Sequence, residues 1–181
     1  MKAFRFVQAS DAHLGYMQYG LAERTGDFLK AFEEFTTKAK ELSPDFVVFA
    51  GDLYSGSLET FDYTEYGHEK GFYLVEVDGD GETKVDTISL SMQRRFRILQ
   101  MDFTGLKPEE IEEKAREAVS NADEEGVIIV LSIDGTLLQG LTKADVKYEI
   151  FRSAAKEALY VHLVNHLRTT EEEALPLTMN S

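Results

Sequence analysis

The sequence predicts a mixed fold, α/β to α+β, because two kinds of pattern follow each other along the chain. A strand, a helix and a second strand occupy residues 2–50 and form a βαβ unit. From residue 71 onward, a hairpin is followed by strands that alternate with helices. The chain has 181 residues, of which 43% are hydrophobic, so it is long enough for one ordinary domain or two small ones.

The first βαβ unit is defined by its apolar spacing and its breaks. Residues 2–9 read as a short strand, and the loop at residues 10–24 precedes a helix for which Asp27 is the expected N-cap. Ser43-Pro44 ends this helix. Residues 45–50 read as a strand and contain the continuous apolar run Phe46-Val47-Val48-Phe49, which is typical of a buried parallel strand. The helix is predicted from apolar residues at helical spacing, namely Phe28, Ala31, Phe32, Phe35 and Ala39.

The middle of the chain predicts a loop and a hairpin. Residues 55–68 are rich in Ser, Gly, Tyr and acids, so they read as a loop. Residues 71–77 read as a strand, the Asp-Gly-Asp-Gly sequence at residues 78–81 as its turn, and residues 84–92 as the returning strand. We expect this hairpin to pair with the first two strands and to cover their exposed edges. Another strand follows at residues 95–101.

The last third predicts a small α+β unit. A helix begins at residues 107–110, with Pro in its first turn and acids at the positive end of its dipole. Residues 127–133 read as a strand that ends in a turn at Asp134-Gly135. A helix at residues 145–157 and a strand at residues 159–167 complete a β-α-β-α-β order.

Composition limits the classes of function. The absence of Cys excludes disulfides and thiolate metal sites, and no apolar run reaches the about 18–20 residues of a membrane-spanning helix. We therefore expect a cytoplasmic protein without membrane partners. The formal net charge of −14 disfavours strong nonspecific binding to DNA, which needs clustered Lys and Arg. Carboxylates are nevertheless good ligands for hard metal ions such as Mn.

Two short motifs carry the chemistry. Asp11 and His13 directly follow the first predicted strand, and Gly51-Asp52 follows the second. Parallel strands lie about 4.8 Å apart, and ligands bind at their carboxyl ends, so these side chains are expected to converge. Two carboxylates and an imidazole suit Mn, Fe or Zn, and a carboxylate at Asp52 would bridge a second ion. Each motif alone is also common in ordinary turns and helix caps.

The residues around both motifs also carry a family resemblance. The first motif continues as Asp11-Ala12-His13-Leu14-Gly15-Tyr16, with Gln18-Tyr19-Gly20-Leu21, Arg24, Asp27-Phe28 and Ala31-Phe32 after it, and the second runs from Asp45 to Tyr54. These residues closely resemble the amino-terminal part of the meiotic-recombination-eleven nucleases, called SbcD in bacteria. That family repairs DNA double-strand breaks and belongs to the calcineurin-like metallophosphoesterases. The resemblance is of the archaeal type and implies Mn as cofactor, with Asp11 and His13 on one ion and Asp52 bridging two.

The resemblance continues after a gap. Residues 54–76 are similar to the segment that follows the family's last motif, and residues from about 95 onward resemble its capping domain. The implied organisation is a truncated metallophosphoesterase domain at residues 1–92, with a junction near residues 53–54, then a capping-like domain at residues 93–168 and a flexible tail at residues 169–181. The expected fold is thus a partial metallophosphoesterase βαβ sheet followed by a small α+β capping domain.

The later motifs of the family, including its catalytic His, are not found in the sequence. His68 follows a Gly but lacks the second His of the closing motif, so we expect it in a loop. Asn165-His166 lies in a predicted strand, where His162 shares its face, and a metal pair is the less expected interpretation. No catalytic residue is therefore assigned.

The leading hypothesis is a Mn-dependent DNA-repair nuclease homologue with impaired or absent activity. The family implies DNA and an SbcC-type coiled-coil ATPase as partners and a homodimer, part of whose interface lies in the missing stretch. The alternatives are a non-catalytic DNA- or partner-binding module, with Arg94, Arg95 and Arg97 as a contact patch or a solvated edge, and a deletion remnant. A generic α/β ligand-binding domain ranks last, because no Gly-rich phosphate loop occurs.

Overall fold

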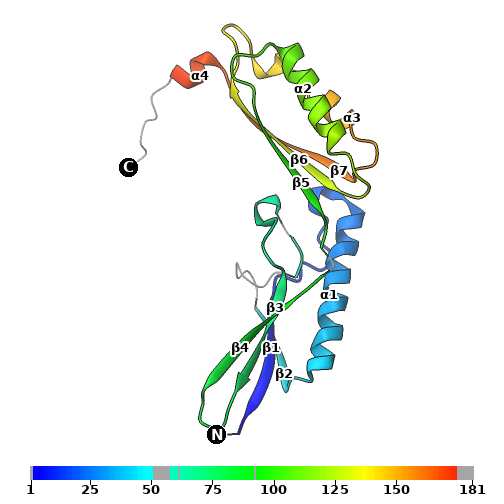
Figure 1. The fold of residues 1–181 in the computed structure, drawn as a ribbon, viewed down its shortest axis with the longest axis vertical. Helices are drawn as coiled ribbons and strands as arrows, with labels where there is room; N and C mark the ends of the chain where they lie inside the picture. The colour runs from blue at the N-terminus through cyan, green and yellow to red at the C-terminus, as the bar shows by residue number, and fades with distance from the viewer. Residues whose placement is uncertain (1, 51–57, 61, 92, 175–181) are drawn as a thin grey trace. The chain divides into compact units, whose positions relative to one another are not determined.

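The computed structural model describes residues 2–50, 58–60, 62–91 and 93–174, and the chain divides into two compact units (Figure 1). Unit 1 is Met1–Arg94 and unit 2 is Arg95–Ser181. Both combine helices with a sheet, so the mixed α/β class predicted from the sequence is confirmed. Within the described part of the chain, no helix is long and apolar enough to cross a membrane.

Unit 1 is a four-stranded sheet with one long helix. The strand order is β2-β1-β3-β4, in which β1 and β2 are parallel and the other neighbours are antiparallel. The predicted βαβ unit is therefore confirmed. The elements are β1 (Phe4–Ser10), a 3-10 turn (Gln18–Gly20), α1 (Ala22–Leu42), β2 (Phe46–Ala50), a 3-10 turn (Tyr63–Glu65), β3 (Gly71–Val77) and β4 (Thr83–Ser89).

Helix α1 covers one face of this sheet and builds the core of unit 1. Its residues Ala31, Phe35 and Ala39 pack in one cluster with Val7 and Ala9 of β1. The cluster extends to β3, where the Phe35 and Phe72 rings meet edge to face with their centroids 4.9 Å apart. The helix ends after Leu42 as predicted, with Ser43 in the left-handed conformation at φ 48°. The apolar periodicity of α1 therefore gave its core face correctly.

The predicted start of α1 is wrong. The helix begins at Ala22 rather than after Asp27. Asp27 lies inside the helix, and its carboxylate accepts hydrogen bonds from the guanidinium groups of Arg24 and Arg94. Asp is a common N-cap residue, but Asp27 serves as an ion-pair partner inside the helix. The local sequence pattern does not distinguish between these two roles.

Strand β2 is parallel as predicted but is not buried. Phe46, Val47 and Phe49 are 46%, 45% and 48% exposed. Among the described residues β2 pairs only with β1, so it forms an edge of the sheet. On its other side β1 pairs with β3, and β3 pairs with β4. The hairpin therefore covers the β1 edge of the βαβ unit, as expected from the sequence. Within the described part of the chain, it does not pair with β2.

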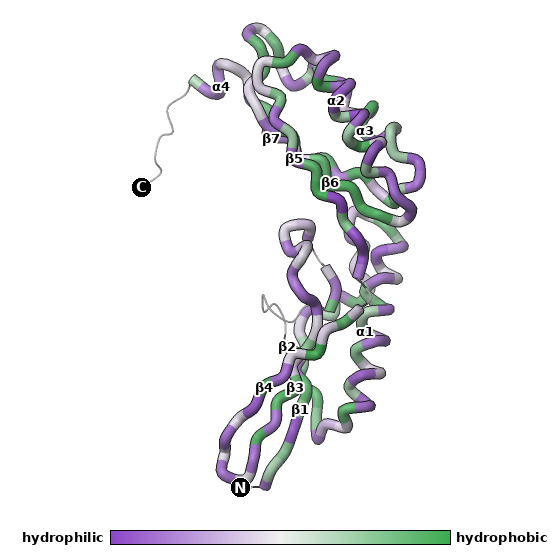
Figure 2. The backbone as a smooth tube through the Cα atoms, viewed as in Figure 1, coloured by the Kyte–Doolittle hydropathy of each residue, from purple (hydrophilic) through white to green (hydrophobic). Residues whose placement is uncertain are grey.

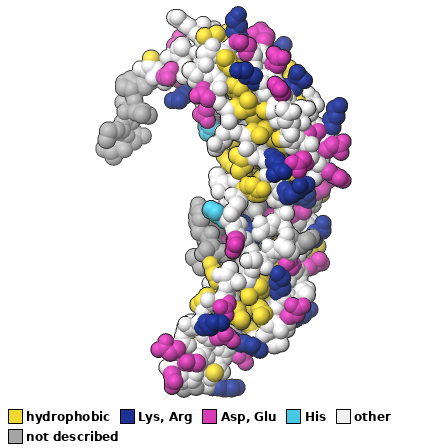
Figure 3. All heavy atoms as spheres, viewed as in Figure 1, with side chains coloured by type: hydrophobic (Ala, Val, Ile, Leu, Met, Phe, Trp, Pro, Cys, Tyr) yellow, Lys and Arg dark blue, Asp and Glu magenta, His cyan; other side chains and the backbone are white. Residues whose placement is uncertain are grey.

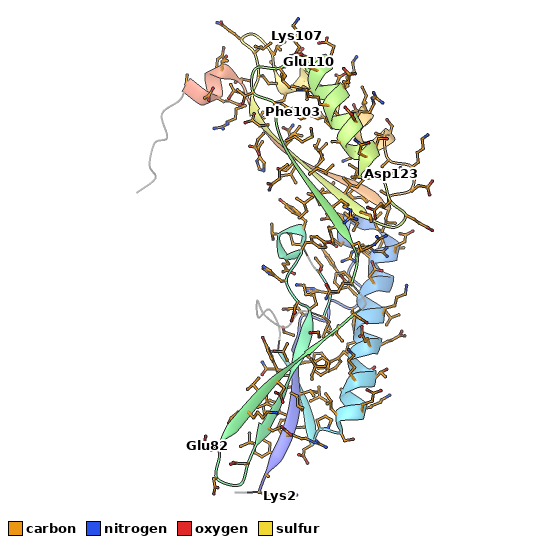
Figure 4. The ribbon with its side chains drawn as sticks, in the orientation of Figure 1. Lys2, Glu82, Phe103, Lys107, Glu110 and Asp123 are labelled. Atoms are coloured by element: carbon orange, nitrogen blue, oxygen red, sulfur yellow. The ribbon has the colours of Figure 1, made fainter. Side chains whose placement is uncertain are left out.

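Unit 2 is a three-stranded parallel sheet in the order β5-β6-β7. The β-α-β-α-β order predicted for this region is confirmed. Strand β6 is the central strand, and its first four residues are all apolar (Figure 2). Ile129 and Leu131 of β6 belong to one core cluster with Ala115 of α2, and Phe103 joins the same cluster (Figure 4). The elements are β5 (Phe96–Asp102), α2 (Pro108–Asn121), β6 (Ile128–Thr136), a 3-10 turn (Lys143–Asp145), α3 (Glu149–Ser153), β7 (Tyr160–Arg168) and α4 (Thr170–Ala174).

Two sequence expectations fail in unit 2 because of contacts between distant residues. Asp134-Gly135 is not a turn, since β6 continues through both residues to Thr136. Gly135 has φ 119°, and a Cβ there would lie 2.5 Å from the backbone N of Thr104, so this Gly serves a close approach. Helix α3 is also shorter than predicted. The N–H groups of residues 156–158 donate to the Asp123 carboxylate and are not available for a helix.

The start of the predicted tail is helical. In α4, the Glu172 N–H donates to the Thr169 hydroxyl, and the Thr169 N–H donates to the Glu172 carboxylate. This reciprocal pair is a capping box, and its Thr-x-x-Glu pattern is visible in the sequence. Residues 175–181 lie outside the described part of the chain.

Candidate metal site at the carboxyl end of the first strand

The candidate site begins where β1 ends. Asp11 and His13 follow Ser10, the last residue of the strand, and both are partly buried. Their φ angles are 52° and 41°, in the left-handed region that residues other than Gly rarely adopt. Each such residue costs about 1–2 kcal/mol, and this kind of strain is concentrated at functional sites. The backbone thus turns sharply at the two residues that the sequence selects as metal ligands.

The His13 side chain is positioned by helix α1. Its ring lies 5.8 Å from the Phe28 ring at an angle of 61°, and 6.0 Å from the Tyr16 ring. The His13 carbonyl oxygen accepts a hydrogen bond of 2.9 Å from the Tyr16 N–H. Phe28 is only 1% exposed, so it gives the imidazole a fixed apolar support. This arrangement explains why a loop residue can hold a defined ring orientation.

The third predicted ligand, Asp52, lies outside the described residues. Strand β2 ends at Ala50, and Ala50 is paired in parallel with Ser10. The carboxyl ends of β1 and β2 therefore lie at the same edge of the sheet, as the motif spacing predicts. Within the described residues no group of three or more His, Asp or Glu side chains could hold a metal ion. Asp11 and His13 supply two ligands, whereas a structural Zn site has about four. These two residues are therefore too few to hold a metal ion by themselves.

Next to this edge lies a buried cluster of ion pairs that sequence reasoning missed. Arg24 of α1 is fully buried, and its guanidinium lies 2.7 Å from the Asp27 carboxylate and 3.6 Å from that of Glu59. It also donates hydrogen bonds to the Thr60 carbonyl and the Gln18 side chain, at 2.6 and 2.7 Å. Polar groups are rarely buried without such partners. The cluster therefore fixes the residues after position 57 against the start of α1.

A second arginine closes the cluster from the end of unit 1. Arg94 binds both carboxylate oxygens of Asp27, at 2.8 and 2.6 Å, and its N–H donates to Glu59 at 3.3 Å. Burial raises the pKa of the Glu59 carboxyl above its ordinary value, although the Arg24 charge and two backbone hydrogen bonds oppose this. The Arg24-x-x-Asp27 spacing within a helix was the available sequence signal, because residues three apart are neighbours on a helix face.

The cluster is connected to the candidate ligand through one aromatic ring. The Arg24 guanidinium carbon lies 5.0 Å from the centre of the Phe28 ring, and Phe28 is also the support of His13. The ion pairs are thus two contacts away from the His13 imidazole. They hold the first turns of α1, and these turns orient His13.

The other histidines lie elsewhere. His68 is exposed in a turn, where its N–H donates to the Glu65 carbonyl, and this agrees with the expected loop. His162 and His166 lie on β7 in unit 2. The register places His166 beside Asp134, at the carboxyl end of that parallel sheet. A pocket of about 430 Å³ there is lined by Asp134, Lys143, Asn165, His166, Leu167 and Arg168.

The proposed basic patch is neutralised. Arg94 is bound to Asp27, and both Arg95 and Arg97 pair with the Glu124 carboxylate, at 3.0 and 2.6 Å. The guanidinium of Arg97 beside Glu124 lowers the pKa of that carboxyl. Arginines already paired with carboxylates contribute little to phosphate binding, so these contacts favour the solvated-edge interpretation.

The chain thus has a βαβ unit with a carboxylate and an imidazole at the carboxyl end of its first strand. These features place it among α/β proteins with a candidate metal site at the edge of the sheet. Within that class, part of the chain is similar to archaeal DNA double-strand break repair protein Mre11. It is 50% identical to the protein of Archaeoglobus fulgidus over 54 residues, which are 30% of this chain and 12% of that protein. The identity is 48% over 50 residues for Methanococcus maripaludis and 50% over 50 residues for Haloferax volcanii, covering 28% of this chain in each case and 13% and 11% of those proteins.

These matches confirm the resemblance inferred from the motifs: the chain is Mre11-like, of the archaeal type, over about 30% of its length. The matched segments cover about a tenth of the length of the relatives reported above. No model of a known protein family matches the chain.

Proposed function

We propose that this chain is a shortened homologue of the Mre11 repair nucleases that retains part of a manganese site and has weak or no phosphodiesterase activity. Asp11, His13 and Asp52 are the proposed ligands. The observation that supports this most directly is the pair of left-handed residues, Asp11 and His13, at the carboxyl end of β1. The similarity to Mre11 over part of the chain supplies the chemistry to test.

The number of available donors is the reason for expecting weak activity. A site with two metal ions needs roughly twice the three ligands proposed here, including nitrogen donors. The chain has four His residues, and only His13 and His68 precede residue 95. His68 lies in an exposed turn. We therefore propose that one ion, rather than two, binds at Asp11, His13 and Asp52.

A bound manganese ion would lower the pKa of a water ligand and would clamp a phosphate group. The protein's own part is to hold the imidazole and the carboxylate at the edge of the sheet. Phe28 supports the His13 ring, and the buried Arg24 cluster fixes the helix that carries Phe28. DNA and an SbcC-type ATPase remain predicted partners.

The test is a calorimetric titration of the full chain with Mn²⁺, supported by electron paramagnetic resonance of the bound ion. We expect saturable binding of no more than one ion, weakened at least about tenfold in Asp11→Asn and in His13→Gln. Asp80→Asn is the matched control, since Asp80 is an exposed carboxylate in the β3–β4 turn, at the other end of the sheet from Asp11. Equal binding by the wild type, Asp11→Asn and His13→Gln would refute the proposed ligands.

Activity is tested separately on double-stranded DNA with Mn²⁺. We expect little or no cleavage. Robust cleavage that is abolished by Asp52→Ala would refute the proposed loss of activity while supporting the ligand assignment. The alternatives are a non-catalytic DNA- or partner-binding module and a deletion remnant of the nuclease.

A further inference from the structure

The carboxyl end of the unit 2 sheet carries an open pocket that is separate from the proposed metal ligands. Because β5, β6 and β7 are parallel, their carboxyl ends lie at one edge, which is where open α/β sheets bind ligands. The volume of about 430 Å³ is within the roughly 300–1,000 Å³ of small-molecule sites. We call it the unit 2 pocket. Its lining comes from the ends of β6 and β7 and from the 3-10 turn before α3, namely Asp134, Lys143, Asn165, His166, Leu167 and Arg168.

Basic side chains gather at this pocket although the chain is acidic. Lys143 and Arg168 both line it, together with His166, whereas the whole chain has a formal net charge of −14. Figure 3 shows basic, acidic and His side chains close together on the surface of unit 2, next to α4. Proteins bind phosphate groups through Arg, which offers a fixed fork of donors, and through Lys, which acts as a point charge. The pocket therefore suits a ligand with an anionic group.

A carboxylate of α4 lies beside these cations. The Glu172 carboxylate is 3.7 Å from the Lys143 amino group, farther than the 2.6 and 3.0 Å of the arginine pairs at the start of β5. The Thr169 N–H holds this carboxylate at 2.9 Å. That hydrogen bond and the charges of Lys143 and Arg168 lower the pKa of Glu172. Glu172 thus stays ionised near the cations without closing on them, in a position to compete with an incoming anion.

The remaining polar groups of the pocket select more than a bare anion. The register places Asp134 beside His166, on the same face of the sheet. The Asn165 side-chain oxygen accepts a hydrogen bond of 3.0 Å from the Leu167 N–H, which fixes the amide. A carboxylate accepts hydrogen bonds from hydroxyl groups but repels a phosphate. The lining therefore favours a ligand that carries a phosphate at one end and hydroxyl groups at the other.

We propose that the unit 2 pocket binds a small phosphorylated sugar. The phosphate lies at Lys143 and Arg168, where it displaces the influence of Glu172, and the hydroxyl groups lie toward Asp134 and Asn165. A small ligand meets only this local lining, whereas a long polyanion such as DNA also meets the acidic surface of the chain. The site is built entirely from unit 2 and goes beyond the proposed metal site of unit 1.

The experiment is a titration of the full chain, labelled with ¹⁵N, with ribose 5-phosphate in the presence of EDTA. We expect saturable changes in the amide signals of Lys143, His166 and Arg168. Lys143→Met and Arg168→Met each raise the dissociation constant at least about tenfold, the size expected for a lost hydrogen bond to a charged group. Glu172→Gln lowers it about two- to fivefold, the size of an exposed ion pair, because Gln keeps an acceptor for the Thr169 N–H but loses the competing charge.

Lys147→Met is the matched control. It removes the same charge from an exposed residue four positions after Lys143, outside the pocket lining, and should bind ribose 5-phosphate as the wild type does. Ribose without the phosphate should not bind, and inorganic phosphate should bind more weakly than ribose 5-phosphate. The amide spectrum of each variant also reports whether the variant is folded.

Three results would overturn the proposal. One is the absence of saturable binding by the wild type. Another is an equal loss in Lys147→Met and Lys143→Met, which would indicate a general effect of charge. The third is binding of a short DNA duplex without binding of ribose 5-phosphate, which would indicate a surface for polyanions. Because EDTA removes Mn²⁺, none of these results depends on the metal site, so the proposed function is tested independently.

Discussion

The left-handed backbone at Asp11 makes a prediction with a definite sign. Replacing Asp11 by Gly or by Ala removes the same carboxylate, so the difference between the two variants isolates the backbone. At φ 52° an L-residue costs about 1–2 kcal/mol relative to Gly. Gly loses about 0.5–1 kcal/mol more conformational entropy on folding than Ala. The Gly variant is therefore expected to be more stable than the Ala variant by about 0.75 kcal/mol, the midpoint of a range from about 0 to 1.5 kcal/mol.

Ala12 provides the internal control for this comparison. It lies between Asp11 and His13, and it is not among the residues with positive φ. Ala12→Gly should therefore destabilise the protein by about 0.5–1 kcal/mol. At residue 13, by contrast, His13→Gly should again be more stable than His13→Ala.

The assay is urea unfolding followed by circular dichroism, with the free energy of unfolding taken from the midpoint and slope. The reasoning requires the sign to alternate along residues 11, 12 and 13. An Asp11→Ala variant as stable as Asp11→Gly, or more stable, would refute the strained conformation. Such a result would also remove the main structural support for a functional site at this turn.

Three further predictions concern buried and bridging charges. Arg24→Met removes the buried donor to the Asp27 carboxylate, the Thr60 carbonyl and the Gln18 side chain, although Asp27 keeps its hydrogen bonds from Arg94. It should lower the free energy of unfolding by about 3–5 kcal/mol, measured in urea, and a loss below about 1 kcal/mol would contradict the buried cluster. Glu59, whose pKa is raised by burial, favours its protonated form in the fold, so its contribution is greatest below 4.5 and is lost as the pH rises through the folded pKa. The stability of Glu59→Gln relative to wild type should therefore increase as the pH rises above 4.5, and a difference that does not change with pH would argue against the raised pKa of Glu59. The backbone N–H of Lys156 lowers the pKa of Asp123, so the stabilisation by the Asp123 carboxylate is present above pH 3.8 and is lost as the pH falls through the folded pKa. Asp123→Asn should therefore lower the thermal midpoint of unit 2 at neutral pH, and an unchanged midpoint would contradict a stabilising role for these hydrogen bonds.

The sequence predicted best where local pattern and tertiary structure agree. The strand β3 has the bounds that the alternation and its flanking glycine indicated, and Ser43-Pro44 ended α1 as expected. Both depend on residues that are close in the chain. The parallel pairing of β1 with β2 was also predictable, because a strand, a helix and a strand permit few arrangements.

The sequence predicted poorly where a distant residue decides the local structure. Asp27 looked like a helix cap but is held by Arg94, which is 67 residues away in the chain. Helix α3 was predicted too long because Asp123 takes the N–H groups that would have continued a helix at residue 156. Periodicity contains no information about such partners, so they become visible only in the folded chain.

The candidate site shows the same division. Asp11 and His13 were found from their position after a strand, and the structure adds the strained backbone that the sequence pattern cannot show. The support of His13 by Phe28, and of Phe28 by Arg24, was not predicted, since it depends on how the loop folds over α1. As metal ligands, Asp11, His13 and Asp52 all stay predictions.

The buried ion-pair cluster bears on whether the shortened chain is a remnant. A remnant of a larger domain should contain buried polar groups whose partners were lost. Here Arg24 and Asp27 from the first block bind Thr60 and Arg94 from the later one, so the two blocks satisfy each other's buried charges. A loss of about 3–5 kcal/mol in Arg24→Met would show that this shared cluster holds the two blocks together as one folded unit, whereas a loss below about 1 kcal/mol would favour a remnant.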